Sequence, residues 1–154
     1  MHCIQSYVSL TDNDHRTLVV YDGSHKLHEH YFMTRGIDTD NDWHVLDKSF
    51  VKSIKHTEKT LHVKKGDMVI WDSRTFHQNT CGVPDCNEER LVQYLCYLPK
   101  NSENNNEEQT LLRKMCFNKK IMTSHWPYPI IPVNKQPTWL YAYHNIDYRI
   151  DYNR

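Results

Sequence analysis

A histidine and an arginine in the middle of the chain are the residues best suited to chemistry. The turn Gly66-Asp67 leads into an apolar strand, a polar break follows, and His77 opens the next strand; Arg90 then opens a further β-rich run. An imidazole can ligate a metal ion, and a planar guanidinium can bind a carboxylate through two parallel hydrogen bonds. Taken alone, His77 is more simply an ordinary histidine at a strand end.

Three other histidines lie close together in the sequence. On a helix only His25 and His28 share a face, whereas His30 points elsewhere. Hydrogen bonding and packing explain this group better than metal binding does. The pair Cys81 and Cys86 can pinch a loop or contribute to a zinc site, but no second cysteine pair follows it.

Composition narrows the class of protein. The 154 residues predict one domain, and a formal net charge of zero gives no basic face for nucleic acid or an anionic membrane. Five cysteines form no disulfide pattern. The first residues lack a signal peptide, and no segment approaches the roughly 20 apolar residues that cross a bilayer. These features predict a soluble protein inside the cell, in a reducing compartment.

Short strands must position the histidine and the arginine. The predicted strands are Ile4–Leu10, Thr17–Tyr21, Leu61–Val63, Met68–Asp72, Thr75–Asn79 and Arg90–Leu98. The first alternates apolar and polar residues, as a half-buried strand does. Strands at this spacing with flanking helices predict a mainly β fold, a β-sandwich or a jelly roll.

Helices are predicted between and after these strands. One begins at Ser24, whose hydroxyl can cap it, and runs to Phe32; a second covers residues 43–56. A third covers residues 109–117, with its apolar side chains inward; these are Leu111, Leu112, Met115 and Cys116. We expect residues 1–126 to form the domain and residues 127–154, which are rich in proline and tyrosine, to form an extended arm.

Several segments resemble, in the same order, parts of phytanoyl-CoA dioxygenase-like proteins. They are Gln5–Leu10, Thr17–His28, Gly66–His77, Arg90–Pro99 and Thr123–Pro127. No single motif is decisive, but the order and spacing of the five extend the resemblance over about residues 2–127. It implies a double-stranded β-helix (a jelly roll, cupin-like) that lacks its early strands and carries flanking helices and a C-terminal arm.

The resemblance also implies a function for the two marked residues. The family consists of Fe(II)/2-oxoglutarate-dependent dioxygenases, in which two histidines and a carboxylate hold the iron. His77 would be the last metal ligand, and Arg90 would bind the far carboxylate of 2-oxoglutarate. Ser73, Arg74 and His25 would lie at the rim of the pocket. No catalytic residue is predicted, and the cofactors would be Fe(II) and 2-oxoglutarate if the site is complete.

The first half of such a site, a His-x-Asp pair, is not found before Ile4–Leu10, where the family places it. The sequence His56-Thr57-Glu58 has the right spacing but follows the Gly-Ser-His element, so its position in the fold order is wrong. Unless Met1 is not the natural start, we expect a truncated or divergent dioxygenase-like protein that is inactive as an isolated chain.

A second interpretation belongs to another class of function. A jelly roll without its early strands exposes sheet edges that favour pairing, and the aromatic arm is typical of a segment that docks on a neighbour. The alternative is a non-catalytic binding or structural subunit, viral in origin on a compositional argument, within an oligomer or larger assembly. Its partner would be a second copy or another protein that covers the exposed edge; a small-molecule substrate is expected only of an active enzyme. A structural role would place it within a viral particle.

Overall fold

The computed structural model describes residues 3–37 and 44–132. The chain forms two compact units, Met1–Pro99 (unit 1) and Lys100–Arg154 (unit 2), and each is described by itself. Among the described residues, no helix is both long enough and apolar enough to cross a membrane.

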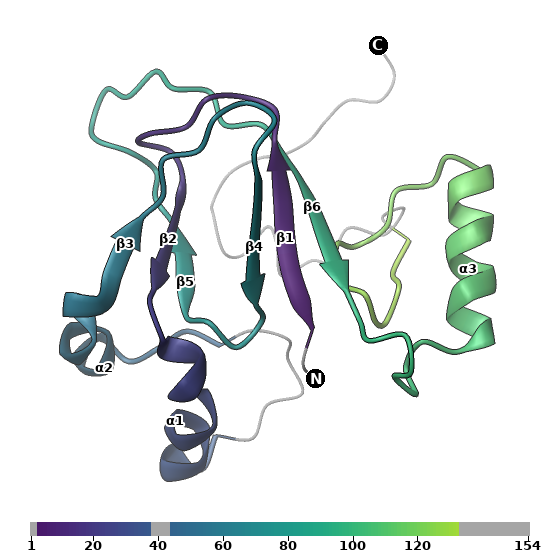
Figure 1. Ribbon diagram of the computed structural model, residues 1–154, viewed down its shortest axis with the longest axis horizontal. Helices are drawn as coiled ribbons and strands as arrows, with labels where there is room; N and C mark the ends of the chain where they lie inside the picture. Colours follow the sequence, from purple (N-terminus) through teal and green to yellow (C-terminus); the bar gives the residue numbers. More distant parts are fainter. Residues whose placement is uncertain (1–2, 38–43, 133–154) are drawn as a thin grey trace. The chain divides into compact units, whose positions relative to one another are not determined.

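Unit 1 contains two three-stranded antiparallel sheets (Figure 1). The strands are β1 (Ile4–Ser9), β2 (Leu18–Tyr21), β3 (Glu58–Thr60), β4 (Met68–Asp72), β5 (His77–Asn79) and β6 (Val92–Tyr97). One sheet has the order β4-β1-β6 and the other β3-β2-β5, so β1 and β2 are the central strands. The predicted mainly β fold is confirmed.

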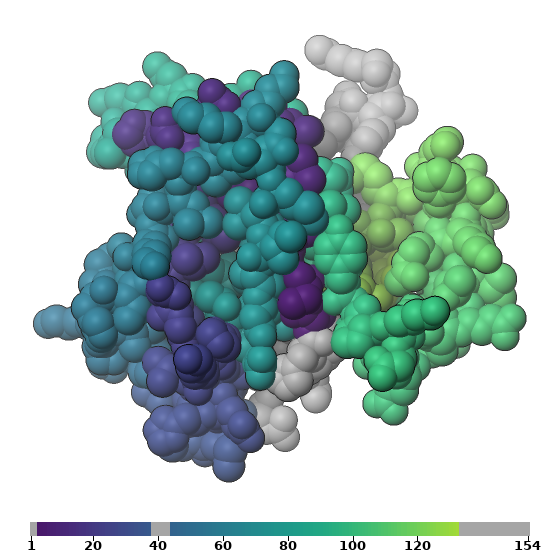
Figure 2. Space-filling view, in the orientation of Figure 1, coloured from purple at the N-terminus to yellow at the C-terminus, as the bar shows by residue number. Residues whose placement is uncertain are grey.

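Two apolar clusters hold unit 1 together. The first lies between the sheets, where Tyr7 of β1 and Leu18 of β2 pack with Val63. The second covers the other side of β2, where Tyr21 packs with Tyr31. Its covering elements are η1 (Ser24–Lys26), α1 (His28–Arg35), α2 (Lys48–Ser53) and η2 (Lys55–Thr57). Figure 2 shows the side chains of unit 1 closely packed on the face in view.

Most predicted strands lie where the structure has them, but β3 does not. It covers Glu58–Thr60, whereas the prediction was Leu61–Val63. The apolar residues Leu61 and Val63 continue toward the core, and Val63 makes only an isolated bridge with Asn13. The ladder with β2 is thus carried by the polar segment that precedes the apolar one.

The helix predicted from Ser24 is divided into η1 and α1, and the predicted cap is wrong. The hydroxyl of Ser24 is buried and accepts a hydrogen bond from the backbone N–H of Phe76, at 2.8 Å. It therefore joins two segments instead of capping a helix. The helix predicted over residues 43–56 is also shorter, because only Lys48–Ser53 is α-helical.

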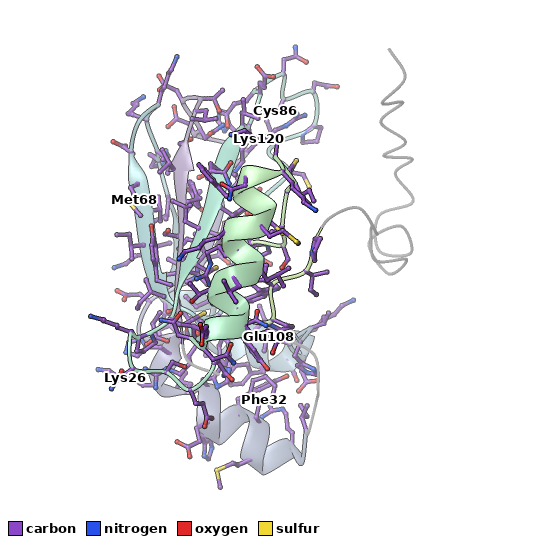
Figure 3. All side chains as sticks on the ribbon, turned by 90° about the vertical axis from the view of Figure 1, so that its right-hand side faces the viewer. Lys26, Phe32, Met68, Cys86, Glu108 and Lys120 are labelled. Atoms are coloured by element: carbon purple, nitrogen blue, oxygen red, sulfur yellow. The ribbon has the colours of Figure 1, made fainter. Side chains whose placement is uncertain are left out.

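Unit 2 contains the predicted third helix as α3 (Glu107–Asn118); Glu108 and Lys120 mark its two ends in Figure 3. The side chain of Asn106 caps it by accepting from the N–H of Gln109, at 3.0 Å. The buried face carries Gln109 and Cys116, whereas Leu111 and Met115 are exposed, so the predicted inward face is only partly right. Helical periodicity places residues 109 and 116 on one face, away from residues 111 and 115.

The described part of the chain beyond α3 includes the first residues of the predicted arm. The amide of Ile130 donates to the side-chain oxygen of Gln109, at 3.1 Å, and Thr123 forms a bridge with Pro132. The rest of the arm, residues 133–154, lies outside the described residues.

Candidate functional site

Tyr7 lies at the centre of the space between the two sheets of unit 1. It stands on the central strand β1, directly opposite Val69 of β4 and Tyr94 of β6, and it is 1% exposed. Its ring packs edge-on against Trp71 and Tyr94, with centroid distances of 6.0 and 5.9 Å. Leu18 packs against it from β2.

The guanidinium of Arg90 lies against this aromatic group. It is 5.2 Å from the centroid of the Tyr7 ring, and both terminal nitrogens donate toward the hydroxyl of Tyr94, at 3.3 Å. Arg90 Nε is a further donor, and it is buried without a hydrogen-bond partner among the described protein atoms. The buried hydroxyls of Tyr7 and Thr17 lie next to one another. Because buried polar groups are nearly always paired, the unpaired Arg90 Nε is a candidate donor to a bound ligand.

The electrostatic environment of Tyr7 favours its neutral form. Burial raises the pKa of the Tyr7 phenol above its ordinary value, and the neighbouring Thr17 and the Arg90 cation only partly offset this effect. A neutral phenol and a guanidinium both donate hydrogen bonds. The group of Tyr7, Thr17 and Arg90, which we call the Arg90 cluster, therefore presents donors and one positive charge, as an anionic ligand such as a carboxylate requires.

His77 stands at the other side of the same aromatic group. It begins the edge strand β5, directly opposite Val20, and its ring packs edge-on against Trp71, with a centroid distance of 5.4 Å. Its Nδ1 lies 2.7 Å from the carbonyl oxygen of Thr75. Two aromatic rings, Trp71 and Tyr7, thus connect His77 with Arg90.

The protonation of His77 follows from these contacts. Because a carbonyl only accepts hydrogen bonds, Nδ1 must carry the proton that it donates to Thr75. Desolvation lowers the pKa of the His77 imidazole, although the Thr75 carbonyl acts in the opposite direction. The neutral ring therefore keeps its lone pair on Nε2, the state in which an imidazole ligates a metal.

The described residues do not complete a metal site around His77. Within residues 3–37 and 44–132, no three His, Cys, Asp or Glu side chains lie close enough together to hold a metal ion. In the sequence His56-Thr57-Glu58, His56 is exposed and Glu58 forms an ion pair with Lys55, at 2.5 Å. The donors found here thus do not fit a centre of two histidines and one carboxylate.

The three residues predicted for the pocket rim lie around the end of β4. The guanidinium of Arg74 forms a two-pronged pair with Asp72, at 2.9 and 2.6 Å, and this pair holds the pKa of the Asp72 carboxyl well below its usual range, with a small contribution from His25. The hydroxyl of Ser73 accepts from the backbone N–H of Cys3, at 3.1 Å. A ligand role for Arg74, Ser73 and His25 stays a prediction.

Sequence analysis missed the polar residues of β1. Gln5 is 6% exposed and accepts a hydrogen bond from the indole N–H of Trp71, at 2.7 Å, so it fixes the ring that contacts His77. Conversely, Ile4 and Leu10, the apolar residues expected on the buried face, are 42% and 45% exposed. The sequence signal that could have identified Gln5 as buried is the two-residue period of a strand, which places Gln5 and Tyr7 on one face.

Comparison with known proteins identifies the family of this chain. The family model for phytanoyl-CoA dioxygenase (PhyH) matches residues 2–80, just over half of the chain, from β1 through β5. The chain is 34% identical over 68 residues to the Ava biosynthesis cluster protein O of Aspergillus versicolor. That alignment covers 44% of this chain and 21% of the relative, so it spans about a fifth of the relative's length. No solved structure matches the chain significantly. On the match over β1 to β5, which includes His77, this chain belongs to the phytanoyl-CoA dioxygenase family.

Proposed function

We propose that this chain is a divergent or partial dioxygenase-like protein that binds 2-oxoglutarate through Arg90. Membership in the phytanoyl-CoA dioxygenase family supports this proposal, because Fe(II) and 2-oxoglutarate are the usual cofactors of that family. The observation that carries the proposal is the buried Nε of Arg90, which has no hydrogen-bond partner among the described residues and lies beside Tyr7 and Thr17.

The Arg90 cluster fits a carboxylate for a physical reason. A buried donor without a partner costs free energy, about 1–3 kcal/mol for a neutral group and more for a charged one. A carboxylate offers two oxygens to one guanidinium and recovers this cost through charge-assisted hydrogen bonds. We propose that the far carboxylate of 2-oxoglutarate takes this position, with Tyr7 and Thr17 as additional donors.

The described residues offer few ligands for a metal ion. His77 would supply one imidazole, and a single imidazole does not hold a divalent ion tightly. We therefore propose that residues 3–37 and 44–132 bind the co-substrate without forming a working iron centre of their own. Two further ligands would have to come from outside these residues, and the free edge of β5 is where a strand that carried them would lie beside His77.

The finer description of the fold is part of the same proposal. Within residues 3–37 and 44–132, β5 and β6 are edge strands of two three-stranded sheets, which is compatible with a jelly roll (double-stranded β-helix) without the strands that would pair there. The division into a domain of residues 1–126 and an arm of residues 127–154 stays a prediction.

The test is a binding measurement with 2-oxoglutarate. We expect calorimetry to detect binding to the unmodified chain, and Arg90→Leu to abolish it, because the variant loses the only charge in the Arg90 cluster. Arg113→Leu, which removes an equal charge from α3, is the matched control and should bind normally. Binding that survives in Arg90→Leu would overturn the proposal.

An anaerobic Fe(II) titration in the presence of 2-oxoglutarate tests the metal side. We expect no visible charge-transfer band from the isolated chain. A band that disappears in His77→Ala would show that the iron site is complete and would contradict the proposed inactivity.

A second function is favoured by the free sheet edges. Among the described strands β5 pairs with β2 only, and all three of its residues, His77–Asn79, are exposed. Unpaired edges favour strand addition by a partner, so the alternative is a non-catalytic jelly-roll subunit that binds a second copy or another protein. Light scattering after gel filtration tests this: a stable oligomer supports it, and a monomer that binds 2-oxoglutarate contradicts it. Neither nucleic acid nor a membrane is proposed as a partner, and a location inside the cell or in a viral particle stays a prediction.

A further inference from the structure

The backbone on both sides of Arg90 is attached to one loop, the β1–β2 connection, which covers residues 10–17. This loop and the β5–β6 connection run along the same end of unit 1 (Figure 1). The attachment involves Glu88, Glu89 and Leu91, so the residues that flank Arg90 in the sequence are held while its side chain extends over Tyr7.

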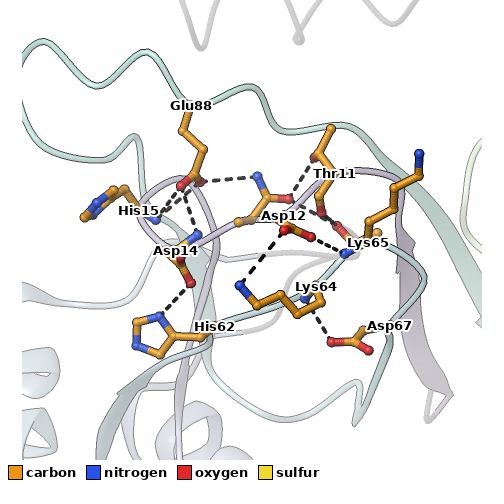
Figure 4. A network of polar contacts seen from close by, with 11 residues as sticks. Thr11, Asp12, Asp14, His15, His62, Lys64, Lys65, Asp67 and Glu88 are labelled. Atoms are coloured by element: carbon orange, nitrogen blue, oxygen red, sulfur yellow. Dashed lines mark hydrogen bonds and ion pairs between the residues drawn. The ribbon is translucent and has the colours of Figure 1, made fainter.

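Before Arg90, the attachment is the carboxylate of Glu88 (Figure 4). It accepts hydrogen bonds from three successive backbone N–H groups, those of Asp14 at 2.9 Å, His15 at 3.1 Å and Arg16 at 2.8 Å. It also accepts one from the side-chain amide of Asn13, at 3.2 Å. One carboxylate thus satisfies three backbone donors that no strand ladder pairs, and hydrogen bonds to an ionised acceptor are the stronger kind.

After Arg90, the attachment is made by the backbone itself. The N–H of Leu91 donates to the hydroxyl of Thr11, at 3.0 Å, and its carbonyl accepts from the N–H of Leu10, at 2.8 Å. The residue directly before Arg90 is held as well: the side-chain amide of Asn13, which is 1% exposed, donates to the carbonyl of Glu89, at 2.9 Å. Because this loop continues directly from β1, it ties the Arg90 backbone to the strand that carries Tyr7.

We propose that Glu88 is a positioning residue for Arg90: its carboxylate, bound by the N–H groups of residues 14–16, holds the guanidinium over Tyr7 in the orientation that receives a carboxylate ligand. The β5–β6 connection is long and has no other regular pairing. Without Glu88, the segment before Arg90 is held by fewer and weaker contacts, and the long arginine side chain regains the rotamer freedom that binding must then remove. This inference rests on the proposed function, since 2-oxoglutarate is taken as the ligand.

The test compares Glu88→Gln with Glu89→Gln, which changes the neighbouring exposed carboxylate in the same way. Two measurements are made on each full-length variant. The first is the NMR signal of the Arg90 Nε–H, which is buried and so should exchange slowly with water. The second is calorimetric binding of 2-oxoglutarate.

In Glu88→Gln we expect faster exchange of the Arg90 Nε–H, loss of protection at the amides of residues 14–16, and binding weakened by about tenfold, as expected for the loss of a charged hydrogen-bonding group. Glu89→Gln should match the unmodified chain in all three. An unchanged Arg90 signal in Glu88→Gln, with the amides of residues 14–16 deprotected, would overturn the inference.

The outcomes also separate this inference from the proposed function. If the unmodified chain does not bind 2-oxoglutarate but the Arg90 signal responds to Glu88→Gln, then the proposed function fails and the positioning role stands. If Glu88→Gln does not fold, Glu88→Asp replaces it, because the shorter side chain keeps the charge but withdraws the carboxylate from the N–H groups of residues 14–16. It should move the Arg90 signal in the same direction, and no movement would again overturn the inference.

Discussion

Arg90 and His77 lie in the same unit but are held in contrasting ways. Arg90 precedes β6, and the residues on both sides of it are hydrogen-bonded to the β1–β2 connection. His77 begins β5, an edge strand whose three residues are exposed, and among the described contacts its imidazole has one hydrogen bond, to Thr75 of the preceding turn. The side of the site that would bind a carboxylate is therefore preorganised, whereas the side that would bind a metal is open.

This contrast shows which half of the proposed chemistry the described residues can support. A preorganised guanidinium loses little entropy when it binds a ligand, which favours the proposed binding of a carboxylate at Arg90. A metal centre needs several ligands at once, and an edge strand supplies one. The two regions should accordingly differ in their sensitivity to mutation, and four predictions follow this difference from large effects to small ones.

The largest effect is expected at Tyr7. Tyr7→Ala removes the ring between Trp71, Tyr94 and Arg90 and leaves a cavity between the sheets, which should lower the free energy of unfolding by about 3–5 kcal/mol. Tyr7→Phe keeps the ring and removes only the hydroxyl, so it should change the free energy of unfolding by less than about 1 kcal/mol. Urea unfolding measures both, and a large loss in Tyr7→Phe would mean that the hydroxyl has a partner in the protein.

The second-largest loss of stability is expected at Asn13, with Asn79 as the comparison. Asn13 is buried and bonded to Ser9, Glu88 and Glu89, so Asn13→Ala should cost about 1–3 kcal/mol by leaving these groups unpaired. Asn79, on the exposed edge strand, provides the matched change, and Asn79→Ala should stay within about 0.5 kcal/mol. Equal losses in the two variants would remove the contrast between the regions.

The third effect is a pH dependence that comes from Glu88. Desolvation opposes its ionisation, but the N–H groups of residues 14–16 and the amide of Asn13 outweigh it and lower the pKa of Glu88 to about 2. Because the folded-state pKa lies below the ordinary value of 4.5, the contribution is fully present above pH 4.5 and is lost as the pH falls toward 2. Unfolding experiments on the unmodified chain and Glu88→Gln should converge over this range. A stability difference that is constant with pH would contradict the assignment.

The smallest effect is expected at His77. His77→Ala removes one ring from an exposed edge and should cost at most about 1 kcal/mol. NMR titration should give a pKa below the ordinary 6.5, since desolvation disfavours the charged ring. The lowered pKa means that this group destabilises the fold as the pH falls below 6.5. A pKa above 6.5 would contradict this and would indicate an anionic group near the ring.

Several elements could be predicted from the sequence because their signals are local. The alternation in β1, the β-branched run of β2 and the Gly-Asp turn before β4 depend on residues within a few positions of one another, and these strands lie where they were expected. β3 could not be placed, because its polar residues carry no strand signal and form a ladder only through pairing with β2. The capping role of Ser24 failed for a related reason, since its partner, Phe76, is 52 residues away.

The sequence by itself determined the family, most of the strands, and the two residues, His77 and Arg90, on which the proposed chemistry depends. The tertiary structure alone decided what surrounds them: the order β4-β1-β6, the burial of Gln5 and Tyr7, and the attachment of Glu88 to a loop more than 70 residues earlier. The physical reason is the separation, along the sequence, of the residues that interact. A strand is specified by the period of its own residues, whereas the environment of a side chain is set by contacts between segments that the sequence keeps far apart.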